Sequence, residues 1–361
     1  MVSDLHLGAR SRGDLLRRKR FIEVLAGEIE GADQVVLLGD VLELRDEPVA
    51  EVLEVARPFF EALGEAIGDG TVVVVPGNHD HQLLSPWLER RRMRDAGPLE
   101  LEHRLKPTGT VLGSLARRMG NAEVVVGYPG VWITPRVYAT HGHYLDCHVT
   151  VPTFERLGVG AMQRLVGGLP NGGRSPDDYE AVQVPLYSFL YGLAQGRDRP
   201  RRLAGAQASA RAWRAMYGRD GRPRSRRGWL LGAVGVPVAV GLANRLGIGP
   251  LRADLSVQEI GRAGVRAMRE VIERLRIDAD HLIFGHTHRR GPLGPEPGWS
   301  LPGGTFLHNT GSWVYARALL GRAPGRSPFW PGTLGIVEDD RAPDLRHLLD
   351  ETSHDELRGR R

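Results

Sequence analysis

The pattern that most constrains the fold is an apolar run followed at once by polar residues. The runs "QVVLLGD" (residues 34–40) and "TVVVVPGNHD" (residues 71–80) are continuous and end in Gly, Asp, Asn or His. A helix-like stretch, residues 14–31 and 49–70, precedes each run. Buried strands that alternate with helices predict an α/β fold. Because α/β sheets collect functional side chains past their strand ends, the polar residues there are candidates for a site.

Five polar groups occur along the chain, each after a strand-like apolar stretch. They are Asp4-Leu5-His6, Gly39-Asp40, Gly77-Asn78-His79-Asp80, His141-Gly142-His143 and Gly285-His286-Thr287-His288. Carboxylates, amide oxygens and imidazoles are ligands for Mn, Fe or Zn. Asp4 and His6, two apart on a strand, can point to one face. Each group alone has an ordinary interpretation as a helix cap or a turn. Five groups in succession favour metal ligation.

In their order, these groups resemble the calcineurin-like metallophosphoesterase superfamily, whose pattern is D-x-H, G-D, G-N-H-D/E, H and G-H-x-H. The resemblance covers roughly residues 2–148 and 277–338. It implies two packed mixed β-sheets flanked by helices, and two divalent metal ions. The implied ligands are Asp4, His6 and His288 for one metal, Asn78, His141 and His286 for the other, and Asp40 as the bridge.

The expected chemistry is hydrolysis of a phosphoric ester. Two divalent ions about 3.5–4 Å apart can generate a bridging hydroxide and neutralise the developing phosphoryl charge. His79 follows the ligand Asn78, so it can reach the substrate without occupying a metal position. We expect His79 to protonate the leaving oxygen, with Asp80 orienting its imidazole, and the resemblance implies the same role for His79. Manganese is the expected metal, and iron or zinc would also fit.

Three further residues are candidates for substrate binding. His143 could contact phosphate or support His141. Arg10 and Arg45 follow the first two metal groups and could bind a substrate phosphate, although exposed arginines are common. Asp146 is expected to be a local hydrogen-bonding residue.

Residues 149–276 interrupt the α/β pattern. They contain an Arg-dense segment (196–228), an apolar run (229–243) and a helical stretch that Ser256 and Glu259 would cap. We therefore predict a core of residues 1–148 and 277–340, a helical cap of residues 149–276, and a charged tail, 341–361, that is at most partly ordered. The apolar run has 15 residues, fewer than the about 20 that span a bilayer. It could form a buried hairpin or lie on an anionic membrane surface.

Several functions remain open at this point. The motifs "SDLHLG" and "GHTHR" resemble those of the branch of UDP-2,3-diacylglucosamine hydrolases. This resemblance favours a nucleotide- or lipid-linked pyrophosphate as the substrate. Many enzymes of that branch carry Arg at the position of His79. A nuclease would use the Arg-dense segment as a phosphate track, but few aromatic residues suitable for base stacking accompany it. The same centre could also serve a phosphoprotein phosphatase, or bind metal in a membrane adaptor without turnover.

Cellular location follows from weaker signals. Cys147 is the only cysteine, and the chain shows no secretory signal pattern. We expect a cytoplasmic protein that can associate peripherally with membrane. Only three residues precede Asp4, fewer than a core strand of about five or six residues needs, so we expect the natural chain to begin upstream.

Overall fold

The computed structural model describes residues 1–107, 109–196, 235–317, 319–321, 323–339 and 341–359. Nearly all of the Arg-dense segment and the start of the apolar run (229–234) lie outside the described residues.

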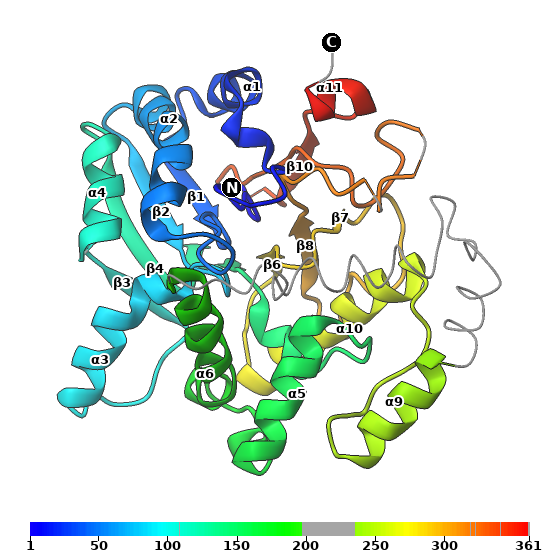
Figure 1. The fold of residues 1–361 in the computed structure, drawn as a ribbon. Coiled ribbons are helices and arrows are strands. Elements are labelled where there is room, and N and C mark those ends of the chain that lie inside the picture. The colour runs from blue at the N-terminus through cyan, green and yellow to red at the C-terminus, as the bar shows by residue number, and fades with distance from the viewer. Residues whose placement is uncertain (108, 197–234, 318, 322, 340, 360–361) are drawn as a thin grey trace.

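The centre of the fold is a mixed eight-stranded sheet with the order β1-β2-β4-β5-β6-β8-β7, in which β3 also pairs with β4 (Figure 1). Its strands are β1 (Gln34–Leu38), β2 (Thr71–Val75), β3 (Glu102–Leu105), β4 (Glu123–Thr134), β5 (Val137–Thr140), β6 (His281–Phe284), β7 (Arg290–Gly291) and β8 (Phe306–Thr310). Strand pairs β1–β2, β2–β4, β5–β6 and β6–β8 are parallel, and the pairs β3–β4, β4–β5 and β7–β8 are antiparallel. The predicted α/β class, with a large mixed sheet and flanking helices, is confirmed.

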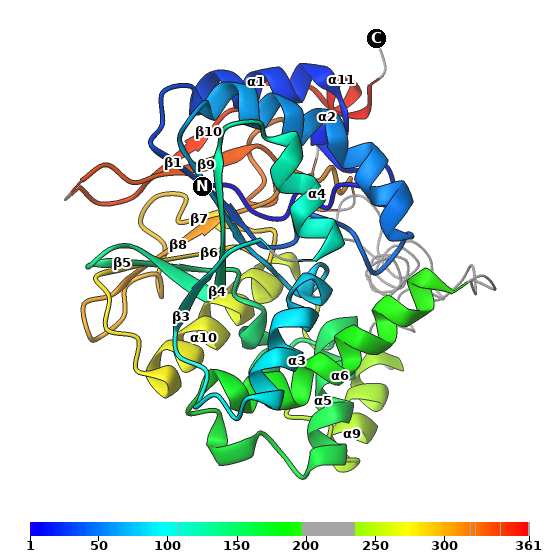
Figure 2. The same ribbon diagram turned by 90° about the vertical axis from the view of Figure 1, so that its left-hand side faces the viewer.

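Helices cover the sheet on both sides, with α1 and α2 above it and α5, α6 and α10 below it in Figure 2. The helices of the core are η1 (Leu15–Arg17), α1 (Lys19–Ile29), α2 (Val49–Ile67), η2 (His81–Leu84), α3 (Ser85–Met93), α4 (Thr110–Arg118) and η3 (His143–Cys147). Val35 and Leu37 of β1 join one hydrophobic cluster, with Phe60 of α2, whereas Val36 and Leu38 join another. Burial on both faces explains why β1 reads as an unbroken apolar run.

A second, small sheet lies beside the first. It consists of the antiparallel strands β9 (Thr333–Ile336) and β10 (Asp344–His347). The start of the chain joins the two sheets. Met1 exchanges backbone hydrogen bonds with Gly335 of β9, and Val2 bonds Val36 and Leu38 of β1. The opening segment thus makes an isolated bridge rather than the strand end that we expected.

The described segment after residue 340, residues 341–359, is folded, which corrects the expectation of a partly ordered tail. It contributes β10 and the helix α11 (His354–Arg358). Leu349 and Leu357 are buried in the hydrophobic cluster that holds α1 and α2, and Arg290 pairs with Asp350. Apolar burial and this ion pair hold a segment that is rich in charged residues.

The described part of residues 149–276 is mainly helical, as predicted. Its helices are α5 (Phe154–Val166), η4 (Pro170–Gly172), α6 (Pro176–Gln195), α9 (Val236–Arg245) and α10 (Val257–Leu275). The Ser256 half of the predicted capping box of α10 is present, because Ser256 Oγ accepts from the Glu259 N–H at 3.2 Å. The Glu259 half is absent, since the Ser256 N–H donates to Asp254 and the Glu259 carboxylate pairs with Arg266. Met268 of α10 packs with Leu282 of β6 in one cluster. The domain boundaries themselves stay a prediction.

The helix α9 is not part of a buried hairpin. Only Val240 of this helix is buried, and Val238 and Leu242 are 65% and 57% exposed. Among the described helices, none is long and apolar enough to cross a membrane.

Candidate metal centre

The five polar groups converge at one place, past the carboxyl ends of β1, β2, β5 and β6. Asp40 follows β1, Asn78 follows β2, His141 follows β5, and His286 and His288 follow β6. Three sets of side chains bring their ligand atoms within 4.8 Å of one another: Asp4, His6 and His288; His6, Asp40 and His79; and Asp40, His141 and His286. These three sets contain every residue that we expected to ligate metal except Asn78. The Asn78 side chain lies beside the third set.

The first set consists of acceptors that face one another. His6 Nε2 lies 3.1 Å from His288 Nε2, and Asp4 Oδ1 lies 3.3 Å from the same atom. His6 Nδ1 lies 2.9 Å from a carboxylate oxygen of Glu43. The Nδ1–H donates to that oxygen, so Nε2 carries a lone pair. Asp4 Oδ1 is buried and has no hydrogen-bond partner among the described residues. Two ring nitrogens and a carboxylate oxygen that converge in this way fit a divalent cation, which would take the place of protons on the rings.

The second set repeats this arrangement. His141 Nδ1 donates to the Leu38 carbonyl at 3.0 Å, which leaves the Nε2 lone pair 3.3 Å from Asp40 Oδ2 and 3.2 Å from the Asn78 side-chain amide. Asp40 Oδ2 also lies 3.7 Å from His6 Nε2. One oxygen of Asp40 thus faces both sets, which is the position of a bridging ligand.

His286 completes the second set. Its Nε2–H donates to Asp146 Oδ1 at 3.0 Å, and its Nδ1 lies 3.1 Å from the Asn78 amide. Asp146 does bond locally, as expected, and its partner is a candidate ligand. The Asn78 amide has two possible orientations. If the nitrogen faces inward, it donates to both imidazoles and the oxygen accepts from Arg45; if the oxygen faces inward, it can ligate a metal. A bound cation would select the second orientation.

The electrostatics of the centre favour cations. Burial alone lowers the pKa of His6, but the Glu43 hydrogen bond and the charges of Asp40 and Glu43 raise it to about 10. Burial likewise opposes protonation of His141, whereas Asp40 raises its pKa to about 9. Imidazoles that hold protons so tightly mark a strongly negative site, which a metal ion would neutralise instead.

Backbone strain is concentrated at the same residues. Five candidate ligands have left-handed φ values, which non-glycine residues rarely adopt: Asp4 (53°), His6 (46°), Asp40 (50°), His286 (63°) and His288 (55°). Gly39, with a φ of 84°, also packs so tightly against His141 that a Cβ there would overlap the imidazole. Such strain costs of order 1–3 kcal/mol per residue and persists at functional sites.

Glu43 is the residue that sequence reasoning missed. It is 3% exposed, and its two oxygens lie 2.9 Å from His6 Nδ1 and 2.7 Å from His79 Nδ1. A single carboxylate therefore orients a candidate metal ligand and the predicted acid. The charge of His79 and the hydrogen bonds from both imidazoles hold the pKa of Glu43 well below its ordinary value, against the effect of burial. A lone Glu within the apolar "VLEL" was the available signal.

The expectation that Asp80 orients His79 is wrong. The Asp80 carboxylate accepts backbone N–H groups instead, from Gly77 at 2.7 Å, Val41 at 2.8 Å and Leu42 at 3.2 Å. Asp80 therefore holds the loops after β1 and β2 together.

The three substrate candidates differ in position. Arg45 is 9% exposed and its Nη1 lies 2.7 Å from the Asn78 amide group, directly beside the centre. Arg10 instead donates to Glu47 at 2.8 Å and to the Asp46 carbonyl at 3.0 Å. His143 is 1% exposed, with its ring centroid 5.6 Å from that of His141. It therefore packs beside His141, and its Nδ1 has no partner among the described residues.

Comparison with known proteins agrees with this geometry. The sequence profile of the calcineurin-like phosphoesterase family matches residues 1–179. The chain belongs to this family. Members of the calcineurin-like phosphoesterase family are metal-dependent phosphoesterases. The chain is also 31% identical over 99 residues to an uncharacterized protein of Acanthamoeba polyphaga mimivirus, an alignment that covers 24% of this chain and 7% of the viral protein. The chain thus spans only a small part of that relative. The match is to the family as a whole and does not identify the UDP-2,3-diacylglucosamine hydrolase branch or any other branch within it.

Proposed function

We propose that this calcineurin-like phosphoesterase hydrolyses a phosphodiester or pyrophosphate bond with two divalent metal ions. The observation that carries the proposal is the convergence of ring nitrogens from His6, His141, His286 and His288 on the carboxylates of Asp40 and Asp4. Asp4, His6 and His288 would hold one ion, Asn78, His141 and His286 the other, and Asp40 both. When bound, the ions supply a nucleophilic hydroxide and neutralise phosphoryl charge.

The protein's own groups have separate tasks. His79 Nδ1 donates to Glu43, and His79 Nε2 lies 3.9 Å from Asp40 Oδ2, so this nitrogen faces the centre. A proton on Nε2 can pass to the leaving oxygen. Glu43 fixes the tautomer and stabilises the charged ring. Arg45, held beside Asn78, is placed to bind a non-bridging phosphate oxygen.

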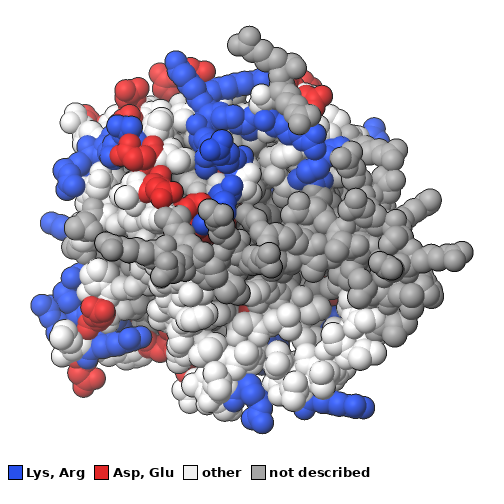
Figure 3. All heavy atoms as spheres, viewed as in Figure 1, with Lys and Arg blue, Asp and Glu red and all other residues white. Residues whose placement is uncertain are grey.

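For the substrate, we favour a nucleotide- or lipid-linked pyrophosphate, hydrolysed at or near a membrane. The support comes from α9, where Val238, Leu242 and Leu246 are 65%, 57% and 56% exposed and recur at four-residue spacing. Residues 235–253 contain no Asp or Glu. In Figure 3 the lower right edge of the molecule is correspondingly white with blue side chains at its rim. An exposed apolar stripe with arginines fits an anionic lipid surface.

The ligand set mixes oxygen ligands with imidazoles, and we favour manganese, with iron or zinc also compatible. We place the protein in the cytoplasm, peripheral at the membrane, because Cys147 is buried and unpaired among the described residues and α9 presents its apolar face.

The test is manganese-dependent hydrolysis of bis-para-nitrophenyl phosphate and para-nitrophenyl phosphate, side by side, with Asp40→Asn as control. We expect diester hydrolysis that the control abolishes. Hydrolysis of the monoester alone would favour a phosphatase. Absence of hydrolysis in metal-loaded protein would favour a binding protein. Salt-sensitive hydrolysis of DNA in preference to pyrophosphate would favour a nuclease.

A further inference from the structure

The cap contains a cavity outside the metal centre. It has a volume of about 430 Å³ and lies among α5, the loops at residues 167–169 and 247–250, and the C-terminal part of α10. Cys147 and His148, at the end of η3, form its inner wall. None of the residues of the metal centre lines it.

The charges around the cavity are all of one sign. Three arginines line it, Arg156, Arg164 and Arg274, and no carboxylate does so among the described residues. The nearest acid to Arg274 is Glu270, whose Oε1 lies 2.7 Å from Arg274 Nε. This pair leaves the other two arginines uncompensated.

Arg156 is a buried charge without an ion-pair partner among the described residues. It is 1% exposed. Its guanidinium donates to two neutral oxygens, those of the Val149 carbonyl at 2.7 Å and the Gln163 side chain at 3.4 Å. Asp146, whose charge acts on Arg156, accepts its hydrogen bond from His286 instead. A buried, unpaired charge lowers the stability of the fold, so an anion bound in the cavity would stabilise the protein by pairing with Arg156.

The α5 face around Arg156 forms one wall of the cavity, with Arg156, Gln163 and Arg164 at helical spacing. Beside them Gly160 is closely packed. A Cβ there would lie 2.6 Å from the Ile248 carbonyl oxygen and 2.7 Å from Arg156 Nη1, so the glycine lets the loop at residues 247–250 approach the guanidinium. Arg164 is exposed, and none of the hydrogen bonds or ion pairs within the described part of the chain involves it. One buried and one unpaired guanidinium thus line the same space.

We propose that this cavity is an oxyanion site that takes a phosphate group, with Arg156 and Arg164 as its donors. Planar guanidinium groups bind phosphate through paired hydrogen bonds, and Arg156 is already fixed by its neutral partners. The site is separate from the metal centre and does not depend on the proposed hydrolysis. Its ligand is either a free phosphate compound or the phosphate of a lipid headgroup.

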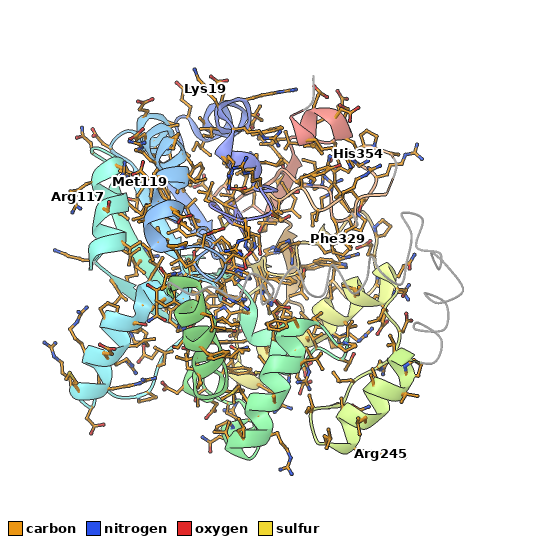
Figure 4. The ribbon with its side chains drawn as sticks, viewed as in Figure 1. Lys19, Arg117, Met119, Arg245, Phe329 and His354 are labelled. Atoms are coloured by element: carbon orange, nitrogen blue, oxygen red, sulfur yellow. The ribbon has the colours of Figure 1, made fainter. Side chains whose placement is uncertain are left out.

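The test counts phosphate sites on the metal-loaded full chain with radiolabelled inorganic phosphate. We expect Asp40→Asn to remove binding at the metal centre only, and Arg164→Gln to weaken binding in the cap by about ten- to hundred-fold, the effect of a lost charged hydrogen bond. Arg156→Lys keeps the positive charge but loses the paired N–H donors of the guanidinium, so it should weaken phosphate binding at the same site. The matched control is Arg245→Gln, because Arg245 lies on α9 outside the cavity (Figure 4) and should leave binding unchanged.

A second arm identifies the source of the phosphate. It measures sedimentation with phosphatidylcholine vesicles that contain or lack phosphatidic acid. An Arg164-dependent preference for phosphatidic acid would assign a lipid headgroup, and Arg164-dependent binding of free phosphate without that preference would assign a soluble ligand. Either result supports the site. If all phosphate binding is lost in Asp40→Asn and none responds to Arg164→Gln or Arg156→Lys, the proposal is overturned. Because activity is not measured, failure of the hydrolase proposal would not produce this result.

Discussion

The Nε2 atoms of His6 and His288 face each other at 3.1 Å, although 282 residues separate them in the chain. Glu43 takes the other nitrogen of His6 as a donor. Two ring nitrogens at this distance need a shared proton or a metal cation between them. Since Asp4 and Asp40 also face this point, a divalent ion could replace the proton there.

Metal content should follow the ligand sets. We expect two divalent ions per chain in the metal-loaded protein, about one in Asp4→Asn, and fewer than one in Asp40→Asn, because only Asp40 faces both sets. Inductively coupled plasma mass spectrometry gives the count. Glu23→Gln, an exposed change on α1, is the control. Two ions retained in Asp40→Asn would contradict the bridging assignment.

His79 and Glu43 should differ in their effects on metal. We expect His79→Ala to lower turnover by about 10²- to 10⁴-fold, the usual contribution of a general acid, with metal content unchanged. Glu43→Gln should lower turnover and also weaken metal binding by about 10- to 100-fold, because Glu43 orients the ligand His6 as well. Loss of a metal ion from His79→Ala would instead identify His79 as a ligand, since it groups with His6 and Asp40.

Arg45 and Arg10 form a matched pair for substrate binding. Arg45→Gln should raise KM by about ten-fold or more, the effect of a lost charged hydrogen bond. Arg10→Gln should leave KM nearly unchanged, because Arg10 is tied to Glu47 and the Asp46 carbonyl. Steady-state kinetics on the best diester substrate separate the two. An equal rise in KM for both variants would contradict the assignment of Arg45, rather than Arg10, to substrate binding.

A buried carboxylate attaches the cap to the core. Glu180 of α6 accepts from Tyr144 Oη at 2.7 Å, from His81 Nε2 at 2.9 Å and from Tyr128. Glu180→Leu leaves three buried donors unpaired, so we expect a loss of about 3–5 kcal/mol in the free energy of unfolding. Urea unfolding followed by circular dichroism measures it. If Glu180→Leu lowered the free energy of unfolding by less than the control Glu23→Gln does, Glu180 would not attach the cap to the core.

The Glu180 contribution should also depend on pH. Burial raises its pKa, but the charge of His81 and the three hydrogen bonds bring it below the ordinary value. A carboxylate whose pKa is lower in the folded state stabilises the fold at pH values above its pKa in the unfolded chain, about 4.3. This stabilisation is lost as the pH falls through the pKa of the folded state. The stability gap between the wild type and Glu180→Gln should therefore narrow below about pH 4.

The exposed stripe of α9 predicts membrane association. Leu242→Ser should reduce sedimentation with anionic vesicles, because it removes apolar surface from the centre of the stripe. Phe189→Ser is the control, since Phe189 is equally exposed, at 62%, but lies on α6. Equal loss in both variants would point to nonspecific adhesion.

Much of the fold and the centre could be predicted from the sequence because the signals are local. The runs before Asp40 and Asn78 are buried on both strand faces, so they read as strands, and the residues after them meet at one sheet edge. The roles of Glu43 and Asp80 depend on loop conformation, which residue spacing does not specify. Adjacency along the chain suggested Asp80 as the partner of His79, whereas the three-dimensional partner lies 36 residues away.

Asp4, near the start of the chain, meets His286 at the metal centre, where the His286 N–H donates to Asp4 Oδ2 at 2.9 Å across a sequence separation of 282 residues. A bound ion would therefore act as a cross-link that closes a very long loop of the chain, and the entropy of loop closure makes such a link stabilising in the manner of a long-range disulfide. The ion cannot template early folding, because its ligands are distant in sequence until the sheet has assembled. Metal uptake should thus be a late event, and a measure of how many molecules have folded completely.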